Sequence, residues 1–356
     1  MSTSLTHRAS RALAAVSAVA LIPLGGLAAQ GNSAAKPSAK SVVHRLPVTP
    51  ETVAYGYYWS DAKPALRIAS GDVIDVETLL TNTPSRLEAA GVAPADVEQS
   101  LRDVVSKVTD RGPGGHILTG PVYVEGADSG DVLEVKILSV DLPLKYGYNG
   151  CSGFMREFCE RSGGTRIIPI DRAKMIGHFG DGIDIPLKPF WGSMGVAPPA
   201  AMGRLSSNPP WQHAGNLDNK ELVAGTTLYI PVFTKGALFS IGDGHAAQGD
   251  GEVDQTAIET SLRGKLQLTV RKDMHLTWPR GETATHWIAM GTDQDLKVAT
   301  QVAVREMVAL LMEKKKLTSQ AAYQLASIAA DLRITQLVDG NVGVHMMIAK
   351  SILETR

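Results

Sequence analysis

The sequence predicts a β-rich α+β fold, with β-sandwich-like sheets and a smaller α+β portion at the C-terminus. Three observations predict it. Short runs of β-forming residues, separated by Gly and Pro, occupy the first part of the chain. Many of the 35 glycines lie in the middle, where they mark turns and loops. From residue 293 onward, apolar residues recur with a helical period instead.

Residues 1–29 are predicted to be a signal peptide, because Arg8 and Arg11 precede a long stretch of small and apolar residues. The alternative is a membrane anchor that stays in place, but Pro23 weakens a spanning helix. We therefore expect a secreted or periplasmic protein with no stable membrane span after cleavage. Residues 30–43 are expected to be a flexible mature N-terminus.

The charged residues nearly balance, with 35 Lys and Arg against 36 Asp and Glu. Cleavage of the signal would remove two Arg and no acidic residue, so the mature protein would be mildly acidic. Nucleic-acid binding depends on neutralising many phosphates. A chain without basic runs is therefore not expected to bind nucleic acid.

Residues 44–145 are predicted to form an N-terminal β-rich part. Runs of β-forming residues at 65–69, 73–77 and 132–138 predict strands with one face toward solvent. A Ser-Gly-Asp triplet precedes the second and third of these runs, where Gly allows a positive φ and Asp bonds its own backbone. One short helix is expected around 94–107, where apolar residues recur at helical spacing.

Residues 146–292 are predicted to form a second β-rich part, whose Gly-rich loops carry the candidate catalytic residues. Short strands are expected within it at 163–170 and 226–233. Residues 293–356 are predicted to form a C-terminal helical, α+β part. Its first helix carries an apolar stripe that we expect to pack on the core, and Thr318 is the expected N-cap of the second helix.

The two cysteines, Cys151 and Cys159, leave the question of a disulfide open. An exported protein can form one. A helix between the two residues would separate their Cα atoms by roughly 12 Å, which is too far for a bridge. A loop between them would permit one.

Two Gly-rich segments, 213–218 and 242–252, concentrate polar residues with catalytic or metal-binding chemistry. In an extended chain, Asp243 and His245 would point to the same face. Carboxylates accept most divalent cations, and His shifts the preference toward zinc or another transition metal. The simpler alternative is a tight hairpin whose acidic side chains cap turns and face solvent.

Several common catalytic motifs are absent. The sequence has no Gly-x-Ser-x-Gly, His-Glu-x-x-His, Gly-x-x-x-x-Gly-Lys or Cys-x-x-Cys pattern. A Ser hydrolase of the common type is therefore not expected. Cys151 is not expected to be a nucleophile either, because no base lies near it in the sequence.

Long, ordered motifs run from about His44 to the C-terminus. They are PFWGSMGVAP at 189–198, GNLDNK at 215–220 and GDGHAAQGDGE at 242–252, together with 116–121, 124–127, 231–232, 236–239, 331–336 and 343–345. In these motifs the chain resembles the acetamidase/formamidase family. The resemblance implies a β-rich fold with an α+β portion, homo-oligomeric assembly, and hydrolysis of short amides to a carboxylate and ammonia.

We hypothesise that a divalent metal ion, with zinc as one candidate, activates water for attack on a small amide substrate. The candidate metal ligands are Asp218, Asp243 and His245, with His116, His213 and Glu125 in reserve; Glu252 or Asp250 would move the proton, and Asn216 and Gln248 would orient the substrate or hold the oxyanion. The alternative is a secreted non-enzymatic β-rich protein whose Gly-rich loop holds a structural cation or binds a glycan.

Overall fold

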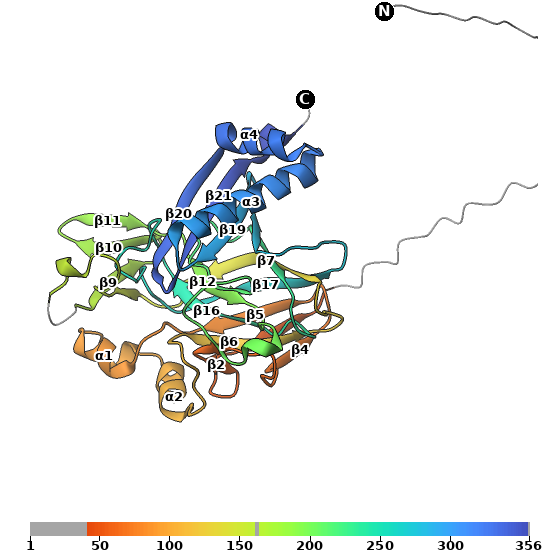
Figure 1. The fold of residues 1–356 in the computed structure, drawn as a ribbon. Helices are drawn as coiled ribbons and strands as arrows, with labels where there is room; N and C mark the ends of the chain where they lie inside the picture. Colours follow the sequence, from red (N-terminus) through yellow and green to blue (C-terminus); the bar gives the residue numbers. More distant parts are fainter. Residues whose placement is uncertain (1–40, 161–163, 355–356) are drawn as a thin grey trace, which may run out of the picture. The chain divides into compact units, whose positions relative to one another are not determined.

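The computed structural model describes residues 41–160 and 164–354 (Figure 1). The predicted signal peptide, 1–29, and most of the predicted flexible N-terminus, 30–43, lie outside the described residues. Within the described ranges, no helix is both long and apolar enough to cross a bilayer.

The largest sheet among the described residues has nine strands, and strands far apart in the sequence are neighbours in it. Its order is β1 (Val43–Leu46), β5 (Val73–Thr78), β17 (Leu262–Arg271), β7 (Val132–Asp141), β15 (Thr227–Pro231), β18 (Arg280–Glu282), β19 (His286–Asp293), β21 (Asn341–Ala349) and β20 (Ala330–Asp339). β1 pairs with β5 in parallel, and the remaining neighbours are antiparallel. Buried and more exposed side chains alternate along much of β7 and β17, as expected for strands with one solvent-facing side.

A second sheet lies against the first. Its order is β14 (Ala214–Asn216), β12 (Phe190–Gly195), β16 (Phe239–His245), β6 (Ile117–Val124) and β2 (Val53–Tyr55), with β4 (Leu66–Ile68) also paired to β6. Every residue of β12 and β16 is buried. Trp191 and Phe239 share one hydrophobic core with Ile137 and Leu266 of the largest sheet. The two sheets therefore pack face to face, which confirms the predicted β-rich, sandwich-like fold.

Smaller elements border these two sheets. A four-stranded sheet contains β8 (Tyr146–Asn149), β9 (Arg166–Asp171), β10 (Ile176–Gly180) and β11 (Ile183–Pro186), and β3 (Tyr57–Tyr58) pairs with β13 (Leu205–Ser206). The 3-10 turns are η1 (Pro94–Asp96), η2 (Arg156–Phe158) and η3 (Ala200–Met202). The helix predicted at 94–107 is found as η1 followed by α2 (Gln99–Lys107), whereas the sequence did not predict α1 (Pro84–Ala89).

The C-terminal helices pack on one end of the largest sheet. They are α3 (Leu296–Lys315), α4 (Ser319–Ala329) and the short α5 (Lys350–Leu353). α3 buries Ala299, Ala303 and Met307 of the predicted stripe, and it packs against β19 and β21 (Figure 1). Thr318 caps α4 as predicted, because its side chain accepts a hydrogen bond from the Ala321 N–H.

Strands from all three predicted parts of the chain, 44–145, 146–292 and 293–356, share the nine-stranded sheet. Residues from Ser41 onward accordingly group into one compact unit. Residues that are distant in the sequence can therefore meet at one site.

Candidate active site

One strand and the segment that follows another bring acidic and His side chains together in the buried sheet. β16 carries Asp243 and His245, and Asp218 follows β14. The Nε2 atom of His245 lies 3.3 Å from Oδ2 of Asp243, and its Nδ1 atom lies 4.0 Å from Oδ1 of Asp218. The three residues are only 1–3% exposed. Asp243 and His245 thus lie close together, in line with the alternation seen in the sequence.

Gly192 in β12 lies directly beneath this cluster. A Cβ atom on Gly192 would lie 2.3 Å from Oδ1 of Asp218, 2.5 Å from Oδ2 of Asp243 and 2.9 Å from Cε1 of His245. Real Cβ contacts are not that short, so any side chain at this position would push the cluster apart. The absence of a side chain at Gly192 makes room for the three groups to converge.

The backbone at the acidic residues is itself unusual. Asp218, Asp243 and Glu252 have φ values of 47°, 58° and 41°, in the left-handed region that residues with side chains seldom adopt. Such conformations cost free energy and cluster at functional sites. The fold therefore holds these three carboxylates in place at some cost in stability.

Two further acidic residues, which the sequence did not single out, complete the cluster. Oε1 of Glu259 lies 3.3 Å from Nε2 of His245. Asp339, at the end of β20, forms a group with Asp218 and Glu252 whose potential ligand atoms all lie within 4.8 Å of one another. A charged residue inside the otherwise uncharged run 257–261 was the available signal for Glu259. Asp339 precedes Gly340 and resembles an ordinary hairpin turn.

β20 is held beside the loop that carries Glu252. The Gly251 N–H donates to the carbonyl oxygen of Thr335 at 2.9 Å, and the Leu337 N–H donates to the carbonyl oxygen of Gly251 at 3.1 Å. These two bonds tie the Gly-rich loop to the C-terminal hairpin. The position of Asp339 relative to Glu252 depends on them.

Side-chain amides fix the orientation of the central groups. Nδ1 of His245 donates to Oε1 of Gln248 at 2.9 Å, because an amide oxygen can only accept, and Nε2 of Gln248 donates to the Asp218 carbonyl oxygen at 2.7 Å. Nδ2 of Asn216 donates to Oδ2 of Asp218 at 2.8 Å, and Ser193 Oγ donates to Oδ1 of Asn216. Nε2 of His245 is thereby turned toward the carboxylates.

Several carboxylate oxygens remain without a partner. Oδ1 of Asp218, Oε2 of Glu252 and Oδ2 of Asp339 are buried and accept no hydrogen bond. Burial raises the pKa of Asp218 and of Glu252 well above their ordinary values, and it raises the pKa of Asp339 to about 6. The cluster is therefore short of positive charge, and it can be balanced by bound protons or by a cation.

The pKa values of His245 and Asp243 shift in opposite directions. Burial alone would lower the pKa of His245, but the nearby Glu259 and Asp243 carboxylates raise it well above its ordinary value. Burial alone would raise the pKa of Asp243, but His116 and His245 lower it. Nε2 of His245 thus faces carboxylates that favour a proton or a cation at that position.

The donor set fits a divalent cation. Asp218, Asp243 and His245 form one group with potential ligand atoms within 4.8 Å of one another, and His245, Glu252 and Glu259 form another. A His nitrogen combined with carboxylate oxygens is a donor set that zinc accepts. The amide that holds Nδ1 of His245 is the kind of orienting partner that metal-binding His residues use.

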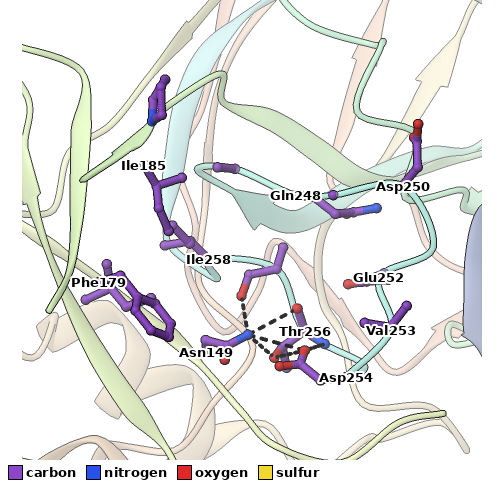
Figure 2. A pocket seen from close by; sticks show the side chains of 15 residues that line it. Asn149, Phe179, Ile185, Gln248, Asp250, Glu252, Val253, Asp254, Thr256 and Ile258 are labelled. Atoms are coloured by element: carbon purple, nitrogen blue, oxygen red, sulfur yellow. Dashed lines mark hydrogen bonds between the residues drawn. The ribbon is translucent and has the colours of Figure 1, made fainter. Parts of the chain in front are cut away.

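Three of the predicted site residues lie apart from this cluster. Glu125 is exposed and pairs with Arg67 at 3.3 Å, so the structure does not bring it to the site. Asp250 lies 3.0 Å from Nζ of Lys220, and Figure 2 shows its carboxylate pointing away from Glu252.

His213 is fully buried against Tyr58, with both ring nitrogens unpartnered. Burial lowers its pKa to about 3, so it is neutral. It does not belong to any of the potential metal-binding groups among the described residues. His116 borders the cluster, with Nε2 3.8 Å from Oδ1 of Asp243.

A polar cavity of about 240 Å³ opens onto the cluster. Its walls include His116, Tyr148, Asn216, Asp243 and Glu259. A small polar molecule in this cavity would contact the buried acids directly. The cluster is therefore accessible to a ligand, although its side chains are almost fully buried.

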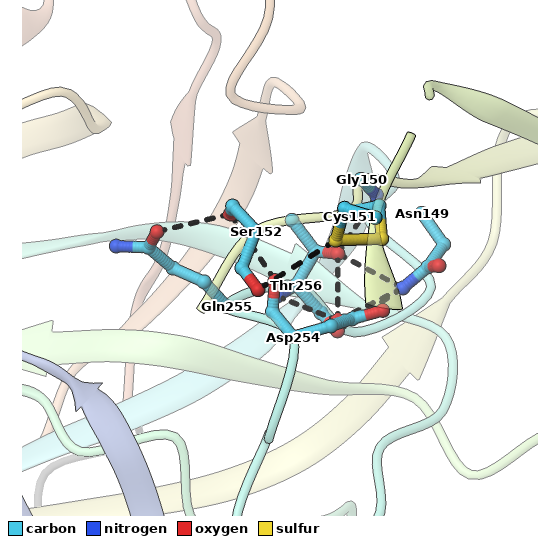
Figure 3. Close-up of a disulfide and its surroundings, with 8 residues drawn as sticks. Asn149, Gly150, Cys151, Ser152, Asp254, Gln255 and Thr256 are labelled. Atoms are coloured by element: carbon cyan, nitrogen blue, oxygen red, sulfur yellow. Dashed lines mark hydrogen bonds between the residues drawn. A yellow bond between two sulfur atoms is a disulfide. The ribbon is translucent and has the colours of Figure 1, made fainter. Parts of the chain in front are cut away.

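A disulfide-closed loop forms part of the rim of this cavity. Cys151 and Cys159 form a disulfide (Figure 3), with their Cα atoms 5.6 Å apart. The bond is possible because the chain between them is mostly irregular rather than a continuous helix. Ser152 Oγ donates to the Asp254 carbonyl oxygen at 3.2 Å and to Oε1 of Gln255 at 3.1 Å. Ser152 and Gln255 both line the polar cavity.

Comparisons with known proteins agree on one family. A family model described as "Acetamidase/Formamidase family" matches residues 57–208 and 203–355. The chain is 31% identical to a formamidase of Methylophilus methylotrophus over 191 residues, 39% of this chain and 47% of that protein. It is 27% identical to an acetamidase of Mycolicibacterium smegmatis over 234 residues, 49% of this chain and 56% of that protein. The chain thus spans about half the length of the curated relatives it matches.

A solved structure extends the likeness to nearly the whole fold. The crystal structure of an acetamidase from Yersinia enterocolitica matches with a TM-score of 0.75 at 27% identity. The match covers 89% of this chain and 95% of that one.

Proposed function

Because the chain belongs to the acetamidase/formamidase family, we propose that it hydrolyses the C–N bond of short linear amides to a carboxylate and ammonia. The observation that carries this proposal is the buried cluster of Asp218, Asp243 and His245 at a polar cavity. Amide hydrolysis needs an activated water, a stabilised oxyanion and a proton for the leaving nitrogen. Buried acids beside a His are suited to these tasks.

Asp218, Asp243 and His245 would hold a divalent cation, and zinc suits their mixed nitrogen and oxygen donors. A bound divalent cation polarises a carbonyl oxygen and lowers the pKa of water. The unpartnered Oδ1 of Asp218 supports this assignment. The position of His245 Nε2 supports it as well, because this atom lies close to the carboxylates of Asp243 and Glu259.

We assign proton transfer to Glu252. Its side chain is buried, its Oε2 has no partner, and it shares a potential ligand group with His245 and another with Asp218. Because burial raises its pKa, Glu252 can hold a proton near neutral pH and exchange it with water or with the leaving nitrogen. Asp250, the other candidate, pairs with Lys220 instead.

Asn216 and Gln248 act here as positioning residues. Their amides are engaged with the Asp218 carboxylate and the His245 ring, so less of their hydrogen-bonding capacity remains for a substrate than the sequence suggested. Both keep the central groups in one orientation, which the chemistry requires.

The proposal is tested by ammonia release from formamide, acetamide and propionamide, with metal analysis of the same sample. We expect turnover that a chelator abolishes and that added zinc restores. Activity that survives complete metal removal would contradict the metal assignment but leave the amidase function intact. No ammonia from any of these amides, with full metal occupancy, would favour the non-enzymatic alternative in which the cation is structural.

We also propose that the protein is exported and works as a homo-oligomer. A signal-like N-terminal segment supports export, and so does the Cys151–Cys159 disulfide, because such bonds persist in oxidising compartments. Mass spectrometry of protein recovered from outside the cytoplasm should find a chain that begins near residue 30. Light scattering of that sample should give a multiple of the chain mass, and a monomer would contradict the assembly.

A further inference from the structure

A second, largely apolar cavity of about 410 Å³ lies beside the acidic cluster. Figure 2 shows Phe179, Ile185 and Ile258 on one side of it and Gln248 and Glu252 on the other. The volume falls within the range of roughly 300–1,000 Å³ that is typical of pockets for small molecules. The cavity is thus large enough for a ligand, and it combines this apolar side with polar residues, which include Asn149, Asp254 and Thr256 as well as Gln248 and Glu252.

Glu252 links this apolar cavity to the polar one. Glu252 and Thr256 line both cavities. Gln248, which accepts the hydrogen bond from His245, lines the apolar cavity as well. The two cavities therefore adjoin at Glu252 and Thr256, so the apolar cavity lies next to the acidic cluster.

We propose, building on the amidase function above, that the apolar cavity is an acyl subsite, and that primary amides with a longer aliphatic or an aromatic acyl group are cleaved more efficiently than formamide and acetamide, which the enzyme also hydrolyses. The carbonyl oxygen and the NH2 group of such an amide both require polar partners. The acyl group is its one apolar end, so the amide lies at the acidic cluster and the acyl group beside Phe179 and Ile185. Formamide and acetamide would leave most of this cavity unused.

Burial of the acyl chain gives the proposal a measurable size. Each methylene group that moves from water into the cavity should raise kcat/KM by about fourfold, until the cavity is full. Ammonia release is therefore measured for acetamide, butanamide, hexanamide and phenylacetamide. We expect kcat/KM to rise along the aliphatic series.

Two tryptophan variants on β11 separate the cavity from the rest of the enzyme. Ile185 lines the apolar cavity, whereas Ile183 on the same strand does not line it and is 52% exposed. Ile185→Trp should lower kcat/KM for hexanamide by at least about tenfold and leave acetamide nearly unchanged. Ile183→Trp should behave like the wild type. If Ile185→Trp does not fold, Phe179→Ala should still lower kcat/KM for hexanamide relative to kcat/KM for acetamide, because it removes apolar contact with the acyl group.

The outcomes for the subsite and for the amidase function are distinct. Cleavage of acetamide with kcat/KM flat or falling along the series would overturn the subsite and leave the amidase function intact. If no amide is cleaved, the amidase proposal fails, and calorimetric titration with hexanamide decides the subsite. Binding that Ile185→Trp abolishes and Ile183→Trp retains would support it, and no binding to the wild type would overturn it.

Discussion

Gly192 contributes to the site because it has no side chain. The carboxylates of Asp218 and Asp243 and the ring of His245 occupy the space where its Cβ atom would lie. These atoms are the ends of side chains, which can move without disturbing the backbone. A methyl group at this position should therefore disturb the site far more than the fold.

We expect Gly192→Ala to fold but to bind less metal and to release ammonia on the order of 100-fold more slowly, because displaced groups lose their alignment. Metal analysis and the ammonia assay check this. Gly249→Ala is the matched control, since a Cβ atom there would meet nothing within 4 Å. Equal activity of the two variants would mean that the convergence at Gly192 is unimportant.

Glu252 and Asp250 provide a second comparison, since both acids lie in the same loop and only one joins the cluster. Glu252→Gln removes the proton carrier with little change in shape, and kcat should fall by about 10²–10⁴-fold. Asp250→Asn, which breaks only the pair with Lys220, should retain most of its activity. The reverse ranking of the two variants would assign the proton transfer to Asp250.

At the scale of elements, local patterns identified those strands and helices whose signals lie in adjacent residues. β5, β7, α3 and the Thr318 cap could be predicted because alternation, helical period and capping are local. The pairing of β17 with both β5 and β7 joins segments that are far apart in the sequence, and no local pattern specifies it. Asp243 and His245 could be predicted because they lie in one Gly-rich segment. Glu259 and Asp339 come from other parts of the chain, so no local pattern joined them to the site.

The loop between Cys151 and Cys159 depends on its covalent closure. Replacing both cysteines with Ser should lower the free energy of unfolding by about 2.5 kcal/mol, because a loop with a sequence separation of 8 regains its entropy in the unfolded chain. Denaturant unfolding of the two proteins measures the difference. A reductant should destabilise the wild type and leave the double variant unchanged; an equal effect on both would contradict this role of the bond.

At the scale of the whole molecule, buried His345 makes stability depend on pH. Burial lowers its pKa from 6.5 to about 4, so the folded protein keeps it neutral while the unfolded chain takes up a proton below pH 6.5. The unfolded state then binds more protons, and the free energy of unfolding falls as the pH drops from about 6.5 to 4. The contribution that is lost is on the order of 3 kcal/mol.

His345→Gln tests this contribution, because Gln does not titrate but can still bond Thr335, which lies 2.7 Å from Nδ1 of His345. Denaturant unfolding between pH 7 and pH 4 should show a shallower decline for this variant than for the wild type. The same change at His275, which is exposed and makes no ion pair within the described residues, should leave the wild-type slope. Parallel curves for His345→Gln and the wild type would exclude His345 as the source.

The two hydrogen bonds between Gly251 and β20 have a consequence for biosynthesis. They place Asp339 against a loop that is made before it during translation. A ribosome-bound chain that has not reached residue 339 has an incomplete acidic wall and an unpaired Gly251. The site can therefore close only after residue 339 has been made, so a product that ends before residue 339 should be inactive even if its central sheets have formed.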